Sequence, residues 1–209
     1  FLGIALVLTA VLAGCGGGGE VAATVVAGVY SDPAVDGDVA YDPVDITYTA
    51  SHASGTGGTG SVWFGIDNGA VHTPEYAGFL DFPLDGSTGG DIVPSNATIV
   101  SADIEVFVTG VSYARTVPVF LDLVDITGSP SADFNSDYLA YRSLDFFSTD
   151  KDNYVRIDVT PLMREAQRLR RPHLQLRFLL DLSVSSGLVE IDDRGTVNST
   201  RPLLTVEYY

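Results

Sequence analysis

The stretch from Val100 to Val108 reads Val-Ser-Ala-Asp-Ile-Glu-Val-Phe-Val, and an apolar residue occupies every second position. Ala102, Ile104 and Val106 are separated by single acidic residues. Successive side chains of a β-strand point to opposite faces, so these apolar residues share one face. The stretch therefore predicts a strand that buries one face in a core and exposes the other to solvent.

The same alternation recurs on both sides of this strand. Counting all such stretches, the sequence predicts about eight strands, separated by turn-rich segments such as residues 85–90. The other predicted strands cover residues 62–66, 76–82, 117–123, 155–159, 174–182, 188–191 and 204–208. Many short strands of this kind indicate an all-β fold, and an antiparallel β-sandwich or jelly roll is the expected architecture.

One short helix is predicted over about residues 160–170. Thr160 is a suitable N-cap and Pro161 suits the first helical position. Leu162 and Ala166 follow at helical spacing, and Pro172 ends the pattern. Its four arginines, at positions 164, 168, 170 and 171, are expected to form a solvated face that neutralises nearby carboxylates, and binding of an acidic ligand is the alternative.

The N-terminal segment predicts export and a lipid anchor. Residues 1–14 are apolar and uncharged, yet too short to span a bilayer, which is typical of the h-region of a signal peptide. Leu12-Ala13-Gly14-Cys15 resembles the bacterial lipobox, so Cys15 is the expected lipidation site and residues 15–19 form a lipidated Cys and glycine tether. The alternative is an ordinary signal peptide with an incidental Cys. We expect an extracellular-facing lipoprotein of the outer membrane or cell surface, held to the membrane by its lipid.

Charge limits the partners of the chain. With 27 acidic and 11 basic side chains, the net charge is −16, which argues against nucleic acid as a partner. No Lys or Arg precedes Arg115, although thirteen acidic residues do. Either solvent or a bound divalent cation must offset this repulsion. Residues 20–60 are predicted to be a peripheral acidic and glycine-rich segment, and residues 61–209 the jelly-roll domain.

Two acidic clusters are candidate sites for a structural calcium ion, which binds closely spaced oxygen ligands. The first comprises Asp150, Asp152 and Asn153, and the second Asp36 and Asp38. The alternative for both is an ordinary turn held by Asx hydrogen bonds. Residues 192–193 are a candidate carboxylate pair of the kind glycosidases use, but adjacent residues of a strand point to opposite faces, so a solvated turn is expected instead.

Catalytic motifs are not found in the sequence. The three histidines lie outside any G-x-S-x-G or H-E-x-x-H pattern, and the single Cys is assigned to lipidation. We therefore expect a protein that is not an enzyme.

Four segments in the second part of the chain form a recognisable series. They are Tyr76–Leu84 (Tyr-Ala-Gly-Phe-Leu-Asp-Phe-Pro-Leu), Val93–Phe107 (containing Ser-Asn-Ala-Thr-Ile-Val-Ser-Ala), Ile157–Leu162 (Ile-Asp-Val-Thr-Pro-Leu) and Arg201–Tyr208 (Arg-Pro-Leu-Leu-Thr-Val-Glu-Tyr). Together they resemble the DNRLRE-domain family of bacterial and archaeal extracellular proteins over roughly residues 61–209. The resemblance implies a β jelly roll classed with carbohydrate-binding modules, some of which bind acidic polysaccharides.

Sugar binding requires exposed aromatic rings with polar groups beside them, and an acidic polysaccharide also requires cations. Aromatic residues are densest between Phe134 and Tyr154. The candidate ligand-binding residues are Tyr138, Tyr141, Arg142, Phe147, Lys151 and Tyr154. The alternative for each aromatic is a place in the core.

Two functions follow from these expectations. The first is a non-catalytic surface lipoprotein whose jelly roll binds an extracellular polysaccharide or matrix component. The second is a structural, fibre-forming subunit that self-associates when residues 21–30 add as a strand to a neighbouring copy. A tether or an edge strand within one monomer is the alternative for that segment.

Overall fold

A computed structural model describes residues 23–51, 60–193 and 200–209 of the chain. The predicted signal segment, Cys15 and the glycine tether lie outside these residues. The strands are β1 (Val25–Tyr30), β2 (Gly37–Asp42), β3 (Thr47–Ser51), β4 (Ser61–Ile66), β5 (Glu75–Pro83), β6 (Ile99–Ser112), β7 (Thr116–Leu123), β8 (Ala140–Phe147), β9 (Asn153–Asp158), β10 (His173–Leu180), β11 (Gly187–Asp192) and β12 (Leu203–Tyr208). The helices are α1 (Pro130–Phe134) and α2 (Thr160–Arg168), with the 3-10 turn η1 (Ser148–Asp150).

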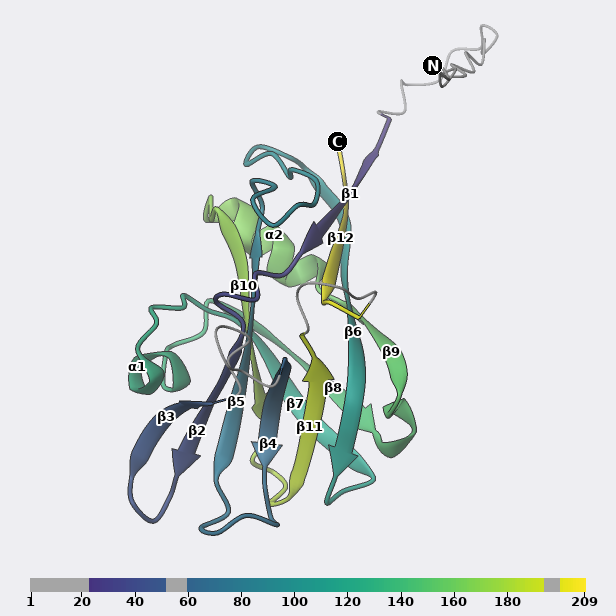
Figure 1. Cartoon of the computed structure of the whole chain (residues 1–209). Helices are drawn as coiled ribbons and strands as arrows, with labels where there is room; N and C mark the ends of the chain where they lie inside the picture. The colour runs from purple at the N-terminus through teal and green to yellow at the C-terminus, as the bar shows by residue number, and fades with distance from the viewer. Residues whose placement is uncertain (1–22, 52–59, 194–199) are drawn as a thin grey trace, which may run out of the picture.

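The strands form one antiparallel sheet that curls on itself (Figure 1). Its main path runs β1-β12-β6-β11-β4-β5-β10-β7-β8, while β9 pairs with β6, and β2 joins β3 to β5. β2 pairs along one edge of β5, while β4, through Gly65–Tyr76 and Ile66–Glu75, and β10, along residues 78–83, share the other edge. The predicted all-β, antiparallel sandwich-like fold is thus confirmed, as a half-barrel sheet that folds over its own core.

Aromatic rings close the two sides of the curled sheet over the core. Phe64 of β4 stacks on Phe178 of β10 with ring centroids 4.7 Å apart, and it contacts Phe146 of β8 at 5.3 Å. All three side chains are fully buried. Burial of a Phe side chain contributes about 1.5–3 kcal/mol relative to exposure, so this cluster is a main source of stability.

The stretch that predicted the fold is the centre of β6. Ala102, Ile104 and Val106 are buried, as expected. The register of β6 against β12 shifts at its N-terminal end, between Glu207 and Tyr208. As a result Ile99 is buried there, while Val100, expected on the buried face, is half-buried.

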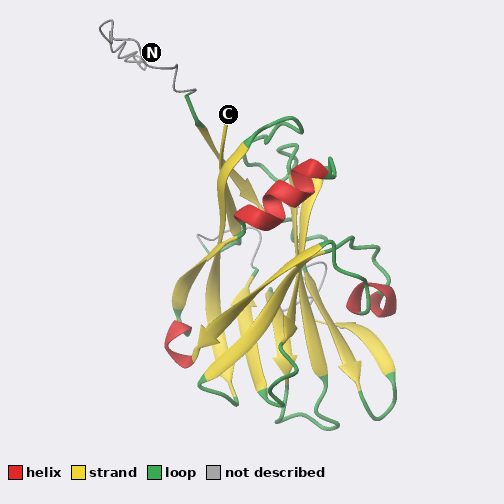
Figure 2. Ribbon diagram, turned by 180° about the vertical axis from the view of Figure 1, so that it is seen from behind, coloured by secondary structure: helices red, strands yellow, loops and turns green. Residues whose placement is uncertain are grey.

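The helix predicted over about residues 160–170 is α2, which lies across one end of the sandwich (Figure 2). Leu162, Met163 and Ala166 enter the core. Thr160 does not act as the predicted N-cap. Its hydroxyl instead accepts a hydrogen bond from the Ala102 N–H at 2.9 Å and so ties the helix to β6. The described residues include no helix long and apolar enough to cross a membrane.

Residues 25–51, within the segment expected to be peripheral, contribute three strands to the same sheet. β1 pairs with β12 along its full length, from Val25–Tyr208 to Tyr30–Leu203. β2 pairs with β5, and β3 extends the sheet beyond β2. The described part of this segment is therefore integrated into the fold, and β1 is an edge strand of its own chain.

Candidate functional site

An aromatic cavity opens on the outer face of β7, β8 and β10, on the side of the sheet away from the main core. Its volume is about 330 Å³. It is lined by Phe120, Asp122, Tyr138, Tyr141, Arg177 and Leu179. Alternation places Phe120, Asp122, Arg177 and Leu179 outward, because their strand neighbours Val119, Leu121, Phe178 and Leu180 point into the core.

The two tyrosines form the rim of this aromatic cavity. Tyr138 is 56% exposed and Tyr141 is 55% exposed, and their ring centroids lie 4.9 Å apart in an edge-to-face arrangement. Tyr141 also meets the edge of Phe120 at 6.0 Å. The rim therefore offers two apolar ring surfaces, with phenol hydroxyls available for hydrogen bonding.

A buried ion pair forms the floor of the cavity. Arg177 Nη2 lies 2.7 Å from Asp122 Oδ2, and both residues are 3% exposed. Arg177 Nη1 also donates hydrogen bonds to the carbonyls of Asp133, Phe134 and Ser136 at 2.9–3.1 Å. Arg177 thus positions the segment that leads to the Tyr138 rim, and its charge is neutralised within the floor.

The structure brings only two of the six predicted ligand residues into this cavity, Tyr138 and Tyr141. Arg142 follows Tyr141 on β8 and points to the other face, where Nη1 donates to the Asp158 carbonyl and lies 3.3 Å from the Asp158 carboxylate. Phe147 shares the outer face of β8 with Tyr141, but six residues further along the strand, about 20 Å away.

The remaining two predicted ligand residues lie near β9. Lys151 is exposed in the turn after η1. Tyr154 is 45% exposed and packs edge-on against Phe107 of β6, with ring centroids 5.0 Å apart. Both cations expected to recognise an acidic sugar, Arg142 and Lys151, therefore lie outside the aromatic cavity.

The cavity residues that the sequence analysis missed are Phe120, Asp122, Arg177 and Leu179. A local signal was available for two of them. Phe120 interrupts the apolar alternation of Val117 to Leu123, and Leu179 does the same in β10. A large apolar residue on the outward phase of a strand is a useful sign of a second packed or binding surface.

A second cavity of about 390 Å³ lies beside β2 and β5. It is lined by residues 34–39, Ala50, Phe79, Asp81, residues 126–128, Pro130, Asp133, His173 and Gln175. His173 Nδ1 lies 2.9 Å from both Asp81 carboxylate oxygens. Burial raises the pKa of Asp81, and the contact with His173 counteracts part of that rise.

The predicted calcium ligands Asp36 and Asp38 are both buried beside this second cavity. Asp36 Oδ1 accepts a hydrogen bond from the Asp81 N–H at 2.6 Å, and Asp38 Oδ2 accepts one from the Trp63 N–H at 2.9 Å.

The expectation of a solvated turn at residues 192–193 is wrong, because Asp192 is 2% and Asp193 0% exposed at the end of β11.

The other predicted calcium cluster forms a hydrogen-bonded turn. Asp150 Oδ2 accepts from the Phe147 N–H at 2.7 Å. Asn153 Nδ2 donates to the carbonyls of Thr149 and Lys151, and Asp152 adopts a left-handed φ of 62°. These contacts are those of the Asx-turn alternative.

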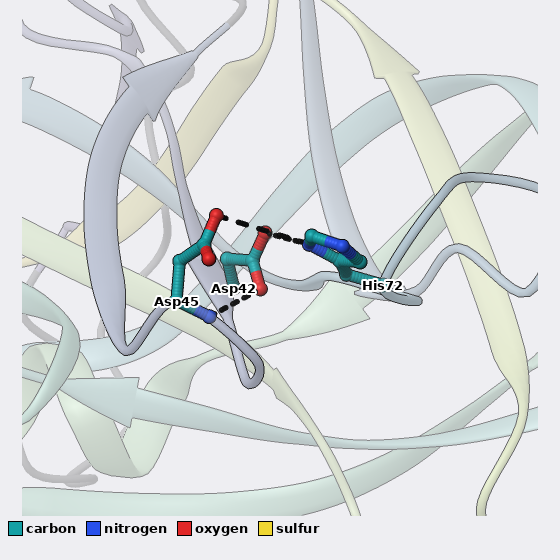
Figure 3. A group of neighbouring side chains, drawn as sticks. All are labelled: Asp42, Asp45 and His72. Atoms are coloured by element: carbon teal, nitrogen blue, oxygen red, sulfur yellow. Dashed lines mark hydrogen bonds and ion pairs between the residues drawn. The ribbon is translucent and has the colours of Figure 1, made fainter.

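An exposed group that the sequence analysis did not predict comprises Asp42, Asp45 and His72 (Figure 3). His72 Nδ1 lies 2.8 Å from Asp42 Oδ2 and 3.9 Å from Asp45 Oδ2. The hydrogen bond from His72 lowers the pKa of Asp42, and the same contact raises the pKa of His72. The group could hold a metal ion, but its exposure makes it a weak site.

The arginines of the helix region are largely engaged within the protein. Arg168 pairs with Glu165 at 2.6 Å, and Arg171 pairs with Asp125 at 2.7 Å. Arg164 donates to the carbonyls of Ile99 and Val100.

Among the surfaces described, the aromatic cavity is the one that combines exposed rings with a built polar floor. Compared with protein-family models and with curated proteins, the chain matches none.

Proposed function

We propose that this chain is a non-catalytic carbohydrate-binding module, and that the aromatic cavity of Tyr138 and Tyr141 holds the glycan. The observation that carries the proposal is the pair of exposed tyrosine rings above a buried, hydrogen-bonded floor. Apolar C–H faces of a sugar ring pack on aromatic rings, and its hydroxyls find partners in phenol groups. The resemblance of residues 61–209 to a family classed with carbohydrate-binding modules supports the same function.

The charge of the cavity favours a neutral glycan. Arg177, its one cation, is paired with Asp122, and the protein carries a net charge of −16. A uronic acid polymer would meet this acidic surface without a cation in the cavity to offset the repulsion. An uncharged polysaccharide or the uncharged part of a matrix glycan is therefore the proposed ligand class.

The proposed location is the cell surface, with the domain facing outward from the outer membrane or cell envelope. The lipobox-like Leu12-Ala13-Gly14-Cys15 supports a lipid anchor, and the following glycines would give the domain reach. A module held in this way could retain a polysaccharide at the cell surface.

The fibre-forming alternative has less support from the edge of the sheet. A loop over residues 86–91 covers the outer side of β1: the Gly28 N–H donates to the Asp91 carboxylate at 2.9 Å, and the Gly28 carbonyl accepts from the Asp91 N–H at 2.7 Å. Thr88 Oγ1 donates to the Tyr30 carbonyl at 2.7 Å. A neighbouring strand would have to displace this loop before pairing with β1.

The proposal is tested with an array of neutral and acidic polysaccharides, followed by calorimetry with an oligosaccharide from the best binder. Tyr141→Ala should weaken binding about tenfold or more, which corresponds to about 1.4 kcal/mol. Tyr154→Ala is the matched control, because Tyr154 is similarly exposed and also packs edge-on against a Phe. Equal losses in the two variants, or no glycan bound by the wild type, would contradict the proposal.

A further inference from the structure

Three buried side chains with oxygen atoms converge where several strands end. Ser31 directly follows β1, Asp36 directly precedes β2, and Asp193 directly follows β11. Their exposed fractions are 0%, 2% and 0%. Buried carboxylates are stable only when they are paired, hydrogen-bonded, protonated or bound to a cation, so each must be accounted for.

Hydrogen bonds within the described residues account for only part of this group. One oxygen of Asp36, Oδ1, accepts the Asp81 N–H at 2.6 Å. The other oxygen, Oδ2, is buried and makes no hydrogen bond with any described residue. Ser31 Oγ is also buried and also makes no hydrogen bond with a described residue. Two buried oxygens thus remain with unused lone pairs at one place.

The two carboxylates also repel each other. Burial raises the pKa of Asp36 well above its usual range, and the adjacent charge of Asp193 raises it further. The Ser31 hydroxyl lies beside the same carboxyl and lowers its pKa. No Lys, Arg or His of the described residues forms an ion pair with Asp36. A positive charge between the two carboxylates would remove the repulsion and use the free oxygens.

We propose that Asp36, Asp193 and Ser31 Oγ bind a divalent cation, and that calcium is its natural occupant. Carboxylate and hydroxyl oxygens are hard ligands, which calcium accepts in irregular arrangements of six to eight. Magnesium instead requires a near-ideal octahedron, so an irregular set of oxygens such as this one suits calcium better. The inference does not depend on the proposed glycan function.

A cation here would have a structural effect, because its ligands come from distant parts of the chain. It would join the end of β1, the start of β2 and the end of β11. Calcium would thus stabilise the protein by binding the folded state alone.

Thermal unfolding of the full protein in calcium and in EDTA tests the proposal. At a hundredfold excess of calcium over its dissociation constant, the midpoint should rise by about 5 °C or more. Asp36→Asn should abolish the rise, and it should remain folded in EDTA because it removes one of two repelling charges. Asp45→Asn is the control, since it weakens the exposed Asp42, Asp45 and His72 group and should leave the rise intact.

Terbium luminescence gives a direct measure of binding. The single tryptophan, Trp63, can serve as the energy donor because it lies close to the site. Its backbone N–H donates a hydrogen bond to Asp38, two residues from Asp36. Terbium should bind the wild type and Asp45→Asn and be displaced by calcium, while Ser31→Ala should weaken its affinity several-fold. A wild-type midpoint indifferent to calcium, or a calcium response that survives in Asp36→Asn, would overturn the proposal. Stabilisation by acid without any calcium response would identify a shared proton instead and would overturn it too.

Discussion

Asp122→Ala removes one partner of the buried ion pair beneath the aromatic cavity. It leaves the Arg177 guanidinium, 3% exposed, without its counter-charge, while the Nη1 bonds to three carbonyls remain possible. Breaking a buried pair in this way costs about 3–5 kcal/mol. The free energy of unfolding of a domain is about 5–15 kcal/mol in total, so this is a large loss. For a chain of this size, it should lower the melting temperature by about 6–20 °C.

The assay for Asp122→Ala is urea unfolding followed by the fluorescence of Trp63, with the slope of the transition compared between variants. The matched control is Asp103→Ala, because Asp103 and Arg156 also approach to 2.7 Å, but Arg156 is 67% exposed at its side chain. That exposed pair should contribute little, so the control midpoint should stay close to the wild type.

A double variant, Asp122→Leu with Arg177→Met, separates the charge from the packing. Burial raises the pKa of Asp122 even though Arg177 lies beside it, which indicates that the desolvation cost exceeds the attraction. Apolar replacement of both partners should therefore recover much of the lost stability. Glycan binding should still fall, because the segment before Tyr138 loses its Arg177 bonds. If Asp122→Ala costs less than about 1 kcal/mol, the reasoning is wrong.

Three further predictions concern the core and the exposed acidic group. Phe178→Ala should destabilise the protein by about 3–5 kcal/mol in urea unfolding, because it empties the centre of the aromatic cluster. Gly78→Ala should cost about 1–3 kcal/mol, measured in the same way, because the added Cβ would lie 2.9 Å from Val62 Cγ1. Asp42→Asn should lower the pKa of His72 toward 6.5, as measured by NMR titration of the imidazole. Since the folded pKa of His72 is raised, its contact stabilises the fold below pH 6.5 and this contribution is lost as the pH rises through the folded pKa.

Local alternation explains how much of the fold could be predicted from the sequence. β6, β7 and β10 each bury one face, so their period of two is visible in single stretches of chain. β8 was missed because it places aromatic residues on its outer face as well, at Tyr141 and Phe147, which hides the period. β2 and β3 are short, and their strand character depends on the pairing of β2 with β3 and with the distant β5, which is not visible in the local sequence.

The candidate sites depended more on contacts between distant strands. Tyr138 and Tyr141 were found because aromatic residues in a polar segment are visible in the sequence. The register of β7 and β10 is what places Arg177 opposite Asp122 beneath them, and the sequence alone does not set that register. Asp193 was expected to be solvated because its burial, and its position beside the distant Asp36, are not visible in the local sequence.

The antiparallel pairing of β1 with β12 also determines how the domain carries mechanical load. Force applied at residue 25 along the axis of β1, away from the sheet, acts parallel to both strands (Figure 1). The hydrogen bonds between the strands run perpendicular to that axis, so they are loaded together in shear. A strand pulled sideways would lose the same bonds one after another. Traction through the N-terminal strand is therefore the direction in which this edge of the domain resists unfolding best.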